Sequence, residues 1–169
     1  YYFGSKEKLV QELLIECARR SDAARCKRLA ELRASGGPTT VRDIVAVIVG
    51  VEVAIADAPD EGGASWMGQM RFILGVQINH RQLMINTMSD DDQAAYLECT
   101  ALLKQFLSGL PSDIVKNRII VCYLYIISVL AAREAAIQRT SRDAVRASGP
   151  FTFENIVQTA CGMLMAPLD

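Results

Sequence analysis

This sequence has few of the residues on which metal and catalytic sites depend. Its 169 residues hold one histidine, His80, and its five cysteines form no CxxC pair or other metal-type spacing. A structural zinc site needs about four such ligands, so we expect no metal site. No GxGxxG, P-loop, HExxH or GxSxG pattern occurs, and no nucleophile stands out beside a base. We therefore expect no catalytic residues and no cofactor.

The sequence also lacks an excess of charge and a long apolar run. Lys and Arg number 18 and Asp and Glu 19, a formal net charge of −1 that gives no general electrostatic attraction to nucleic acid. The longest apolar run, 119–132, is shorter than the roughly 18–20 residues that span a bilayer. We therefore expect no association with a membrane.

The composition is that of one folded domain. Hydrophobic residues make up 51% of the chain and charged residues 22%, enough to build a substantial core. The cysteines, at positions 17, 26, 99, 122 and 161, all lie in helix-like apolar stretches. A free thiol packs there as a small hydrophobe, so we expect a reducing, cytoplasmic location, with a redox-sensing cysteine as the alternative.

Helical periodicity dominates the sequence, and no stretch alternates as a half-buried strand does. Ser5, Thr40 and Thr152 are good N-caps, and Gly36-Gly37-Pro38 should end the first helix. The pattern predicts an all-α fold of about six helices. Their expected ranges are 5–34, 41–56, 65–88 with a break near Gly75, 89–108, 113–142 and 153–165.

The first helix would be roughly 45 Å long at about 1.5 Å per residue, the geometry of a connecting rod. Its middle is crowded with Arg19, Arg20, Arg25, Lys27 and Arg28. Basic residues in mid-helix usually form a solvated face or pair with acidic neighbours, here Glu16, Asp22 and Glu31. Contact with DNA phosphates is the alternative.

The segment 66–88 is the best candidate for a ligand site, because it combines the only tryptophan with four methionines and a few polar residues. A small-molecule site needs an apolar cavity with a few aimed polar groups, and methionine adapts to varied ligands. The alternative is an ordinary core. With two residues from later helices, the candidate ligand-binding residues are Trp66, Met67, Met70, Ile73, Leu74, Gln77, His80, Phe106 and Tyr123.

The stretch 119–127 is apolar on every side of a helix, so it must be covered on every side, by its own domain or by a partner. Ser128, Ala131, Ala132 and Ala135 follow as a stripe of small residues where another helix could come close. The residues alone support an internal core and a subunit interface equally.

The first nine residues are Tyr1-Tyr2-Phe3-Gly4-Ser5-Lys6-Glu7-Lys8-Leu9. This order of an aromatic cluster, a small turn pair and a helix start resembles the segment that joins the recognition helix of TetR-family regulators to their ligand-binding domain. The Leu110-Pro111 turn before a long apolar helix and the closing helix that ends at Ala166-Pro167 extend the resemblance more weakly along the chain.

The resemblance implies a division of the chain. Residues 1–4 would be the end of a helix-turn-helix domain whose remainder lies upstream of Tyr1, residues 5–34 the connecting helix, and residues 35–169 the ligand-binding and dimerisation domain. Tyr1, Tyr2 and Lys6 would contact DNA phosphates, which suit phenolic hydroxyls, an ammonium and a helix N-terminus. Packing between domains is the alternative for the two tyrosines.

In TetR-like proteins the last two long helices form a four-helix bundle across a two-fold axis. The resemblance therefore favours a homodimer over an internal core for the helices 113–142 and 153–165. The dimer interface is expected at Ile127, Leu130, Ala131, Glu134, Ile156, Thr159, Ala160 and Met163.

The function that the resemblance implies is ligand-responsive transcriptional regulation. A bacterial, cytoplasmic homodimer would bind double-stranded operator DNA through the missing N-terminal domain, as a repressor released by a small hydrophobic effector. The alternative is a helical module that binds a small molecule without regulating DNA. A helical enzyme would need a polar catalytic cluster, and the sequence does not contain an evident one.

Overall fold

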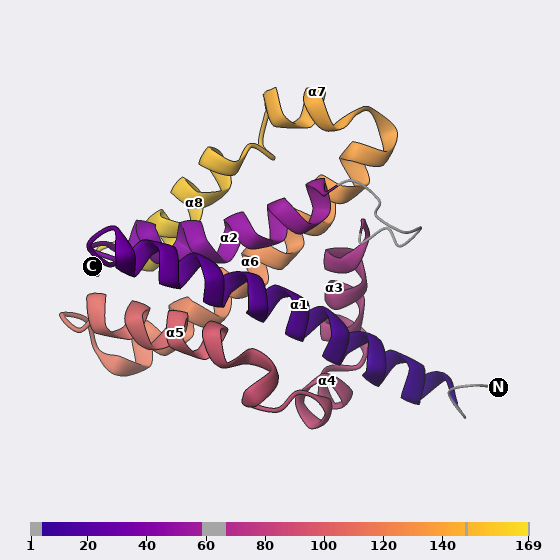
Figure 1. The fold of residues 1–169 in the computed structure, drawn as a ribbon. Coiled ribbons are helices and arrows are strands. Elements are labelled where there is room, and N and C mark those ends of the chain that lie inside the picture. Colours follow the sequence, from indigo (N-terminus) through magenta and orange to yellow (C-terminus); the bar gives the residue numbers. More distant parts are fainter. Residues whose placement is uncertain (1–4, 59–66, 148, 169) are drawn as a thin grey trace.

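The computed structural model describes residues 5–58, 67–147 and 149–168, and every regular element in these ranges is helical (Figure 1). The expected all-α class is confirmed. Within the described ranges there are eight α-helices and one 3-10 turn, where about six helices were expected. In chain order they are α1 (Lys6–Ala34), α2 (Val41–Asp57), α3 (Gln69–Asn79), α4 (Arg81–Thr87), η1 (Asp91–Gln93), α5 (Ala94–Phe106), α6 (Ser112–Arg139), α7 (Arg142–Ala147) and α8 (Phe153–Met165).

The helices with strong local signals begin and end where the sequence predicts. The Thr40 hydroxyl accepts the N–H of Asp43, and the Asp43 carboxylate accepts the N–H of Thr40, which makes a complete capping box for α2. Ser5 and Thr152 cap α1 and α8 through their hydroxyls. At the end of α1, Gly37 has a φ of 83°, in the left-handed region that favours glycine.

The break in the segment 65–88 lies at His80 and not near Gly75. Gly75 stays helical inside α3, whereas His80 has φ −140° and ψ 40° and separates α3 from α4. α4 then packs against both α1 and α3. The single non-helical residue, His80, turns the chain so that the short α4 can reach α1. The sequence of 65–88 alone could not predict this contact, because the contact depends on a residue range outside it.

The helix expected over 113–142 also ends earlier. α6 ends at Arg139, and Thr140, with φ −124° and ψ −105°, turns the chain into the separate helix α7. The Thr140 hydroxyl donates to the carbonyl of Ala136 at 3.0 Å, and the Ser141 hydroxyl accepts the N–H of Ala144 at 3.2 Å. Two adjacent hydroxyl residues therefore satisfy backbone groups at one helix end and the next helix start.

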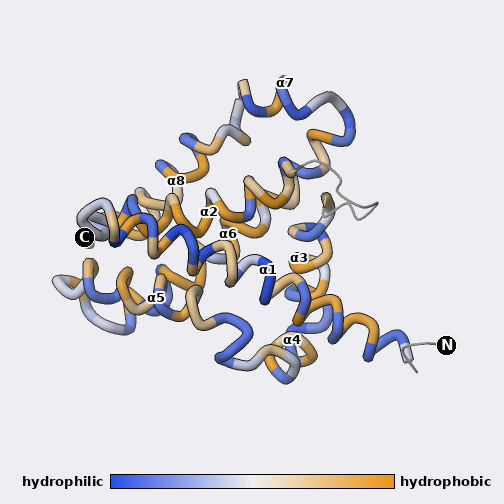
Figure 2. The backbone as a smooth tube through the Cα atoms, viewed as in Figure 1, coloured by the Kyte–Doolittle hydropathy of each residue, from blue (hydrophilic) through white to orange (hydrophobic). Residues whose placement is uncertain are grey.

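The core forms around α2, which packs against α1, α5, α6 and α8. Figure 2 shows apolar residues along most of α2, whereas α1 alternates between polar and apolar. Ile44, Val45 and Val49 of α2 are completely buried. The Val- and Ile-rich helix α2 is therefore covered by other helices on several sides.

α6 packs against α2, α3, α5 and α8. By length and composition alone this helix could cross a membrane, although its uninterrupted apolar run is shorter than a span. Cys122, Ile126 and Leu130 are buried inside the chain, whereas Ile120 and Val121 are 42% and 52% exposed. One chain therefore covers only part of the apolar surface of α6.

Candidate functional site

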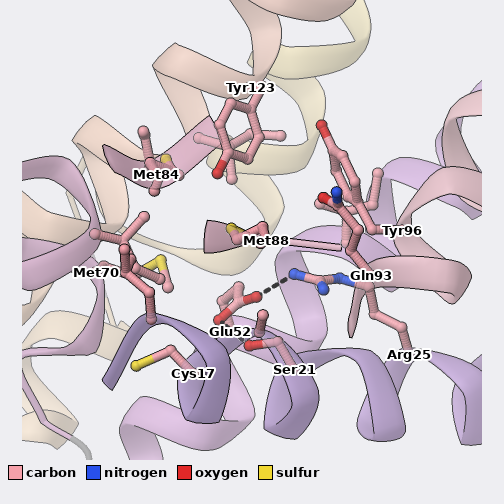
Figure 3. A pocket seen from close by; sticks show the side chains of 16 residues that line it. Cys17, Ser21, Arg25, Glu52, Met70, Met84, Met88, Gln93, Tyr96 and Tyr123 are labelled. Atoms are coloured by element: carbon pink, nitrogen blue, oxygen red, sulfur yellow. Dashed lines mark hydrogen bonds and ion pairs between the residues drawn. The ribbon is translucent and has the colours of Figure 1, made fainter. Parts of the chain in front are cut away.

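A pocket of about 70 Å³ lies between α1 and the helices α2 to α6 (Figure 3). Its wall is mostly apolar, with a polar group on one side. The apolar lining consists of Leu14, Cys17, Ala18, Ile48, Met70, Ile73, Met84, Met88, Ile126 and Ile127. The polar lining consists of Ser21, Arg25, Glu52, Gln93, Tyr96 and Tyr123.

The polar side of the pocket is organised by Glu52, which is 5% exposed. Its carboxylate pairs with the guanidinium of Arg25, and a dashed line in Figure 3 joins the two side chains. The other carboxylate oxygen accepts the hydroxyl of Ser21 at 3.1 Å and the amide N–H of Gln69 at 3.2 Å. Burial raises the pKa of Glu52, and the Arg25 guanidinium opposes that shift. The three donors support the ionised form, so the network joins α1, α2 and α3 around one carboxylate.

Two tyrosines form the neighbouring part of the wall. The ring centroids of Tyr96 on α5 and Tyr123 on α6 are 5.6 Å apart with an interplanar angle of 56°. The Arg25 guanidinium carbon lies 5.5 Å from the centroid of the Tyr96 ring, a cation–π distance. Burial raises the pKa of both phenols, so their hydroxyls stay protonated and can donate hydrogen bonds.

The opposite side of the pocket carries sulfur-containing side chains. Met70, Met84 and Met88 come from α3, α4 and the turn after it, and Figure 3 shows all three around the pocket. Cys17 of α1 lies among them, and burial raises the pKa of its thiol to about 11. The thiol is therefore protonated and unreactive at neutral pH. The methionine side chains can change shape around an occupant.

A carboxylate of α6 holds α3 in place beside the pocket. The N-cap residue of α3 is Gly68, which provides no side-chain cap and has a φ of 110°. Glu134, 1% exposed, accepts the N–H of Met70 at 3.1 Å and the N–H of Arg71 at 3.2 Å. Glu134, which belongs to α6, thereby acts as the cap of α3. This contact positions Met70 and Ile73 in the pocket wall.

A second carboxylate does the same for α5. Asp22 of α1 accepts the N–H of Ala95 at 3.0 Å and the N–H of Tyr96 at 2.9 Å. The expected helix start at Ser89 is instead the short η1 turn, where Ser89 and Asp92 bond to each other, and α5 begins at Ala94. Tyr96 is therefore placed in the pocket by a residue of α1.

Three of the nine residues expected to bind ligand line the pocket, namely Met70, Ile73 and Tyr123. Leu74 and Phe106 are half-buried and pack against the main core. The remaining side chains lie elsewhere: Met67 and Gln77 are half-buried, His80 is exposed, and Trp66 is outside the described residues.

Sequence reasoning missed Ser21, Arg25, Glu52 and Tyr96. One signal was available, since Glu52 is an acidic residue in the middle of the apolar run Val49-Gly50-Val51-Glu52-Val53. A buried carboxylate in such a run needs a cationic or hydrogen-bonding partner, but the sequence does not say which one.

Six of the eight residues expected at a dimer interface are buried within the chain itself. Ile127, Leu130, Ala131, Glu134, Ile156 and Ala160 are at most 4% exposed. Thr159 is exposed and Met163 is half-buried. α8 packs against α2 and α6, so the burial of these side chains is accounted for inside one chain.

Other residues of α6 and α8, which were not expected at the interface, are exposed as well. Val121 and Met165 are 52% and 53% exposed, and they belong to two helices that pack against each other. Ser128 on α6 and Gly162 on α8 are also exposed. A partner that used these helices would contact this outer face.

The residues expected to contact DNA phosphates lie at or before the start of α1. Lys6 is exposed and lies in an open groove beside His80, whereas Tyr1 and Tyr2 are outside the described residues. The arginines in the middle of α1 have acidic partners. Arg19 pairs with Asp92 at 2.7 Å, Arg20 with Glu16 at 3.7 Å, Arg25 with Glu52, and Arg28 with Glu31 at 3.1 Å.

The other expectations concern metal and thiol chemistry. Across 5–58, 67–147 and 149–168, no three His, Cys, Asp or Glu side chains form a group that could hold a metal ion. All five cysteines are free, and Cys26 alone among them is exposed.

Comparisons of this chain with protein-family models, with curated proteins and with solved structures find no match. The function is therefore inferred from the pocket, from its place in the fold and from the resemblance of the first nine residues.

Proposed function

We propose that this chain is the ligand-binding and dimerisation part of a TetR-type transcriptional regulator, a repressor that a small hydrophobic molecule releases from its operator. The observation that carries the proposal is the position of the pocket. Leu14, Cys17, Ala18, Ser21 and Arg25 of α1 form one of its walls. By the resemblance, α1 is the helix that follows directly on the DNA-binding domain, so an occupant of the pocket touches the connecting helix itself.

The proposed mechanism uses α1 as a lever. Its 29 residues form one unbroken helix, about 44 Å long at about 1.5 Å per residue. A ligand that enters the pocket displaces α1 relative to α2 and α3, and the displacement reaches the Lys6 end. In a dimer this changes the spacing of two reading helices, which must match half-sites roughly 34–36 Å apart. The ligand must prefer the DNA-incompetent form, commonly by about 1–3 kcal/mol.

The proposed dimer uses the outer face of α6 and α8. Support comes from Val121 and Met165, which are apolar, more than half exposed and carried on neighbouring helices. Of the expected interface residues on α8, Thr159 is exposed and Met163 is half-buried. Two copies of this pair of helices would form the four-helix bundle of the proposal. The regulator would act in the cytoplasm.

The test is DNA binding by the complete protein, including any residues that precede Tyr1. Its affinity for its own promoter DNA and for scrambled DNA is measured across a salt series. We expect selective binding to the promoter that weakens as salt rises, because phosphate contacts release counterions. If both DNAs bind equally weakly, regulation of DNA is rejected and the helical small-molecule-binding module becomes the better account.

A matched pair of variants tests the phosphate contact. Lys6→Ala should weaken binding to all sequences and lower the salt slope by about one, the effect of losing a single phosphate contact. Lys8→Ala is the control, since Lys8 is also exposed and occupies the variable position of the family pattern, between Glu7 and Leu9. Equal salt slopes for both variants would remove Lys6 from the DNA interface.

A further inference from the structure

The ionised groups of the pocket balance each other. Arg25 and Glu52 are the cation and the anion of its lining, and they form an ion pair. Glu134, the next buried carboxylate, is occupied by the start of α3. A charged ligand would therefore bring an uncompensated charge into a mostly apolar site, which is strongly unfavourable.

The hydrogen-bonding groups of the pocket are not balanced. The carboxylate of Glu52 already accepts from Arg25, Ser21 and Gln69. In contrast, the Nε–H of Arg25 is buried and has no partner. Tyr96 and Tyr123 belong to the same lining, and their phenol hydroxyls can donate as well. Because Glu52 already accepts three hydrogen bonds, the polar side of the pocket has more donors than acceptors.

Two amides bear on this count. The Oε1 atom of Gln69 is a buried acceptor without a donor, but Gln69 does not line the pocket. Gln93 does line it, and its amide can donate or accept. Neither amide removes the surplus of donors around Arg25 and the two tyrosines.

The rest of the pocket favours an apolar, compact molecule. Ile48, Ile73 and Ile126 contribute rigid aliphatic walls, and the methionines contribute adaptable ones. A volume of about 70 Å³ has room for several water molecules. A ring compound with eight or nine non-hydrogen atoms needs more room than this, which the adaptable methionine side chains would have to provide by moving.

We infer that the pocket selects an uncharged apolar molecule that carries a hydrogen-bond acceptor oxygen, of the ketone or ester class. The oxygen accepts hydrogen bonds on the polar side of the pocket, where Tyr96, Tyr123 and Arg25 lie, and the hydrocarbon part lies against the isoleucines and methionines. This inference rests on the proposed ligand-binding role of the pocket. It also explains why a polar network stands in an otherwise apolar wall: the Arg25–Glu52 pair keeps the donors in place without attracting ions.

The experiment uses four probes on one benzene ring: acetophenone, ethylbenzene, benzoate and benzylammonium. Their binding to the complete protein is measured by titration calorimetry at neutral pH, with competition between pairs. We expect acetophenone to bind about tenfold more tightly than ethylbenzene, because its carbonyl adds a hydrogen bond to the same apolar contacts. Benzoate and benzylammonium should not displace it. The inference is overturned if either ion binds as tightly as acetophenone, or if acetophenone and ethylbenzene bind equally.

Conservative variants locate the donors. Tyr96→Phe and Tyr123→Phe keep the ring and should each weaken acetophenone binding about two- to tenfold while leaving ethylbenzene binding unchanged. Tyr125→Phe is the matched control, because Tyr125 is a half-buried tyrosine of α6 outside the pocket lining. Equal effects of all three variants would overturn the assignment of the donors.

The ligand test and the DNA test fail separately. If none of the four probes binds, the ligand class is overturned, while selective promoter binding by the same protein would still support the regulator. If the probes bind as expected but promoter and scrambled DNA do not differ, the ligand class stands and the regulator is rejected.

Discussion

Replacing Glu134 tests whether a single carboxylate of α6 holds the wall of the pocket. Its side chain is 1% exposed and accepts the N–H groups of Met70 and Arg71 at the start of α3. α3 has no cap of its own, because Gly68 offers no side chain. The variant Glu134→Ala therefore removes the acceptors of both N–H groups at once.

The size of the effect follows from the burial of the two donors. An unpaired buried N–H costs about 1–3 kcal/mol, and Met70 is 3% exposed, so its N–H cannot turn to water. Arg71 is exposed and its N–H can be hydrated, so it adds less. The truncated side chain also leaves an unfilled space, which adds to the loss of stability. We therefore expect Glu134→Ala to lower the free energy of unfolding by about 2–4 kcal/mol. Glu134→Gln keeps a neutral acceptor and should lower it by about 1–2 kcal/mol.

The assay is urea unfolding followed by far-UV circular dichroism, at several protein concentrations because dimerisation would add to the apparent stability. The control is Gln138→Ala, one turn further along α6, which removes an exposed hydrogen bond from Arg71 at 3.0 Å. That change should stay within about 0.5 kcal/mol of the wild type. If Glu134→Ala also stays within this range, the carboxylate does not hold α3, and the account of the pocket wall is refuted.

Two further predictions concern titrating groups. At pH 8 the exposed thiol of Cys26 should react promptly with a disulfide reagent, and the other four thiols should react only after unfolding. Those four are buried, and burial raises the pKa of the Cys17 thiol, for example, to about 11. A second fast-reacting thiol in a reagent titration would contradict this. A hydrogen bond from the backbone N–H of Thr39 holds the pKa of Asp43 in the folded protein below its usual value of 3.8. The α2 cap therefore contributes its full stabilisation of the folded state above pH 3.8, and this contribution is lost as the pH falls through the lower pKa of the folded protein. Asp43→Asn should therefore lower stability by about 1 kcal/mol at pH 7 and by less at pH 2, and an equal loss at both would show that the charge is not responsible.

The helix ends were predictable where their causes are local. The Thr40 capping box involves residues three apart, and the end of α1 depends on Gly36 and Gly37. The break at His80 and the end of α6 at Arg139 were placed wrongly. The first depends on how α4 packs against α1, and the second on a pair of hydroxyl residues that the apolar pattern concealed.

The pocket was predictable only in its apolar part. Met70, Ile73 and Tyr123 lie in apolar periodic segments and were expected to bind ligand, and all three line the pocket. His80 belongs to the same segment but is exposed, because the chain breaks at that residue. Periodicity identifies which residues of a helix avoid water, but it does not say what they face.

The sequence by itself determined that the chain is all-α, where its strongest helix signals lie, and that it carries enough apolar surface for a core. These properties depend on interactions within a few residues and on composition. The tertiary structure alone decided that Arg25 meets Glu52, that Asp22 caps α5, and that Glu134 caps α3 and is not exposed on α6. Such contacts join residues that are 27 to 73 positions apart. They depend on how whole helices pack, and no local pattern records that packing.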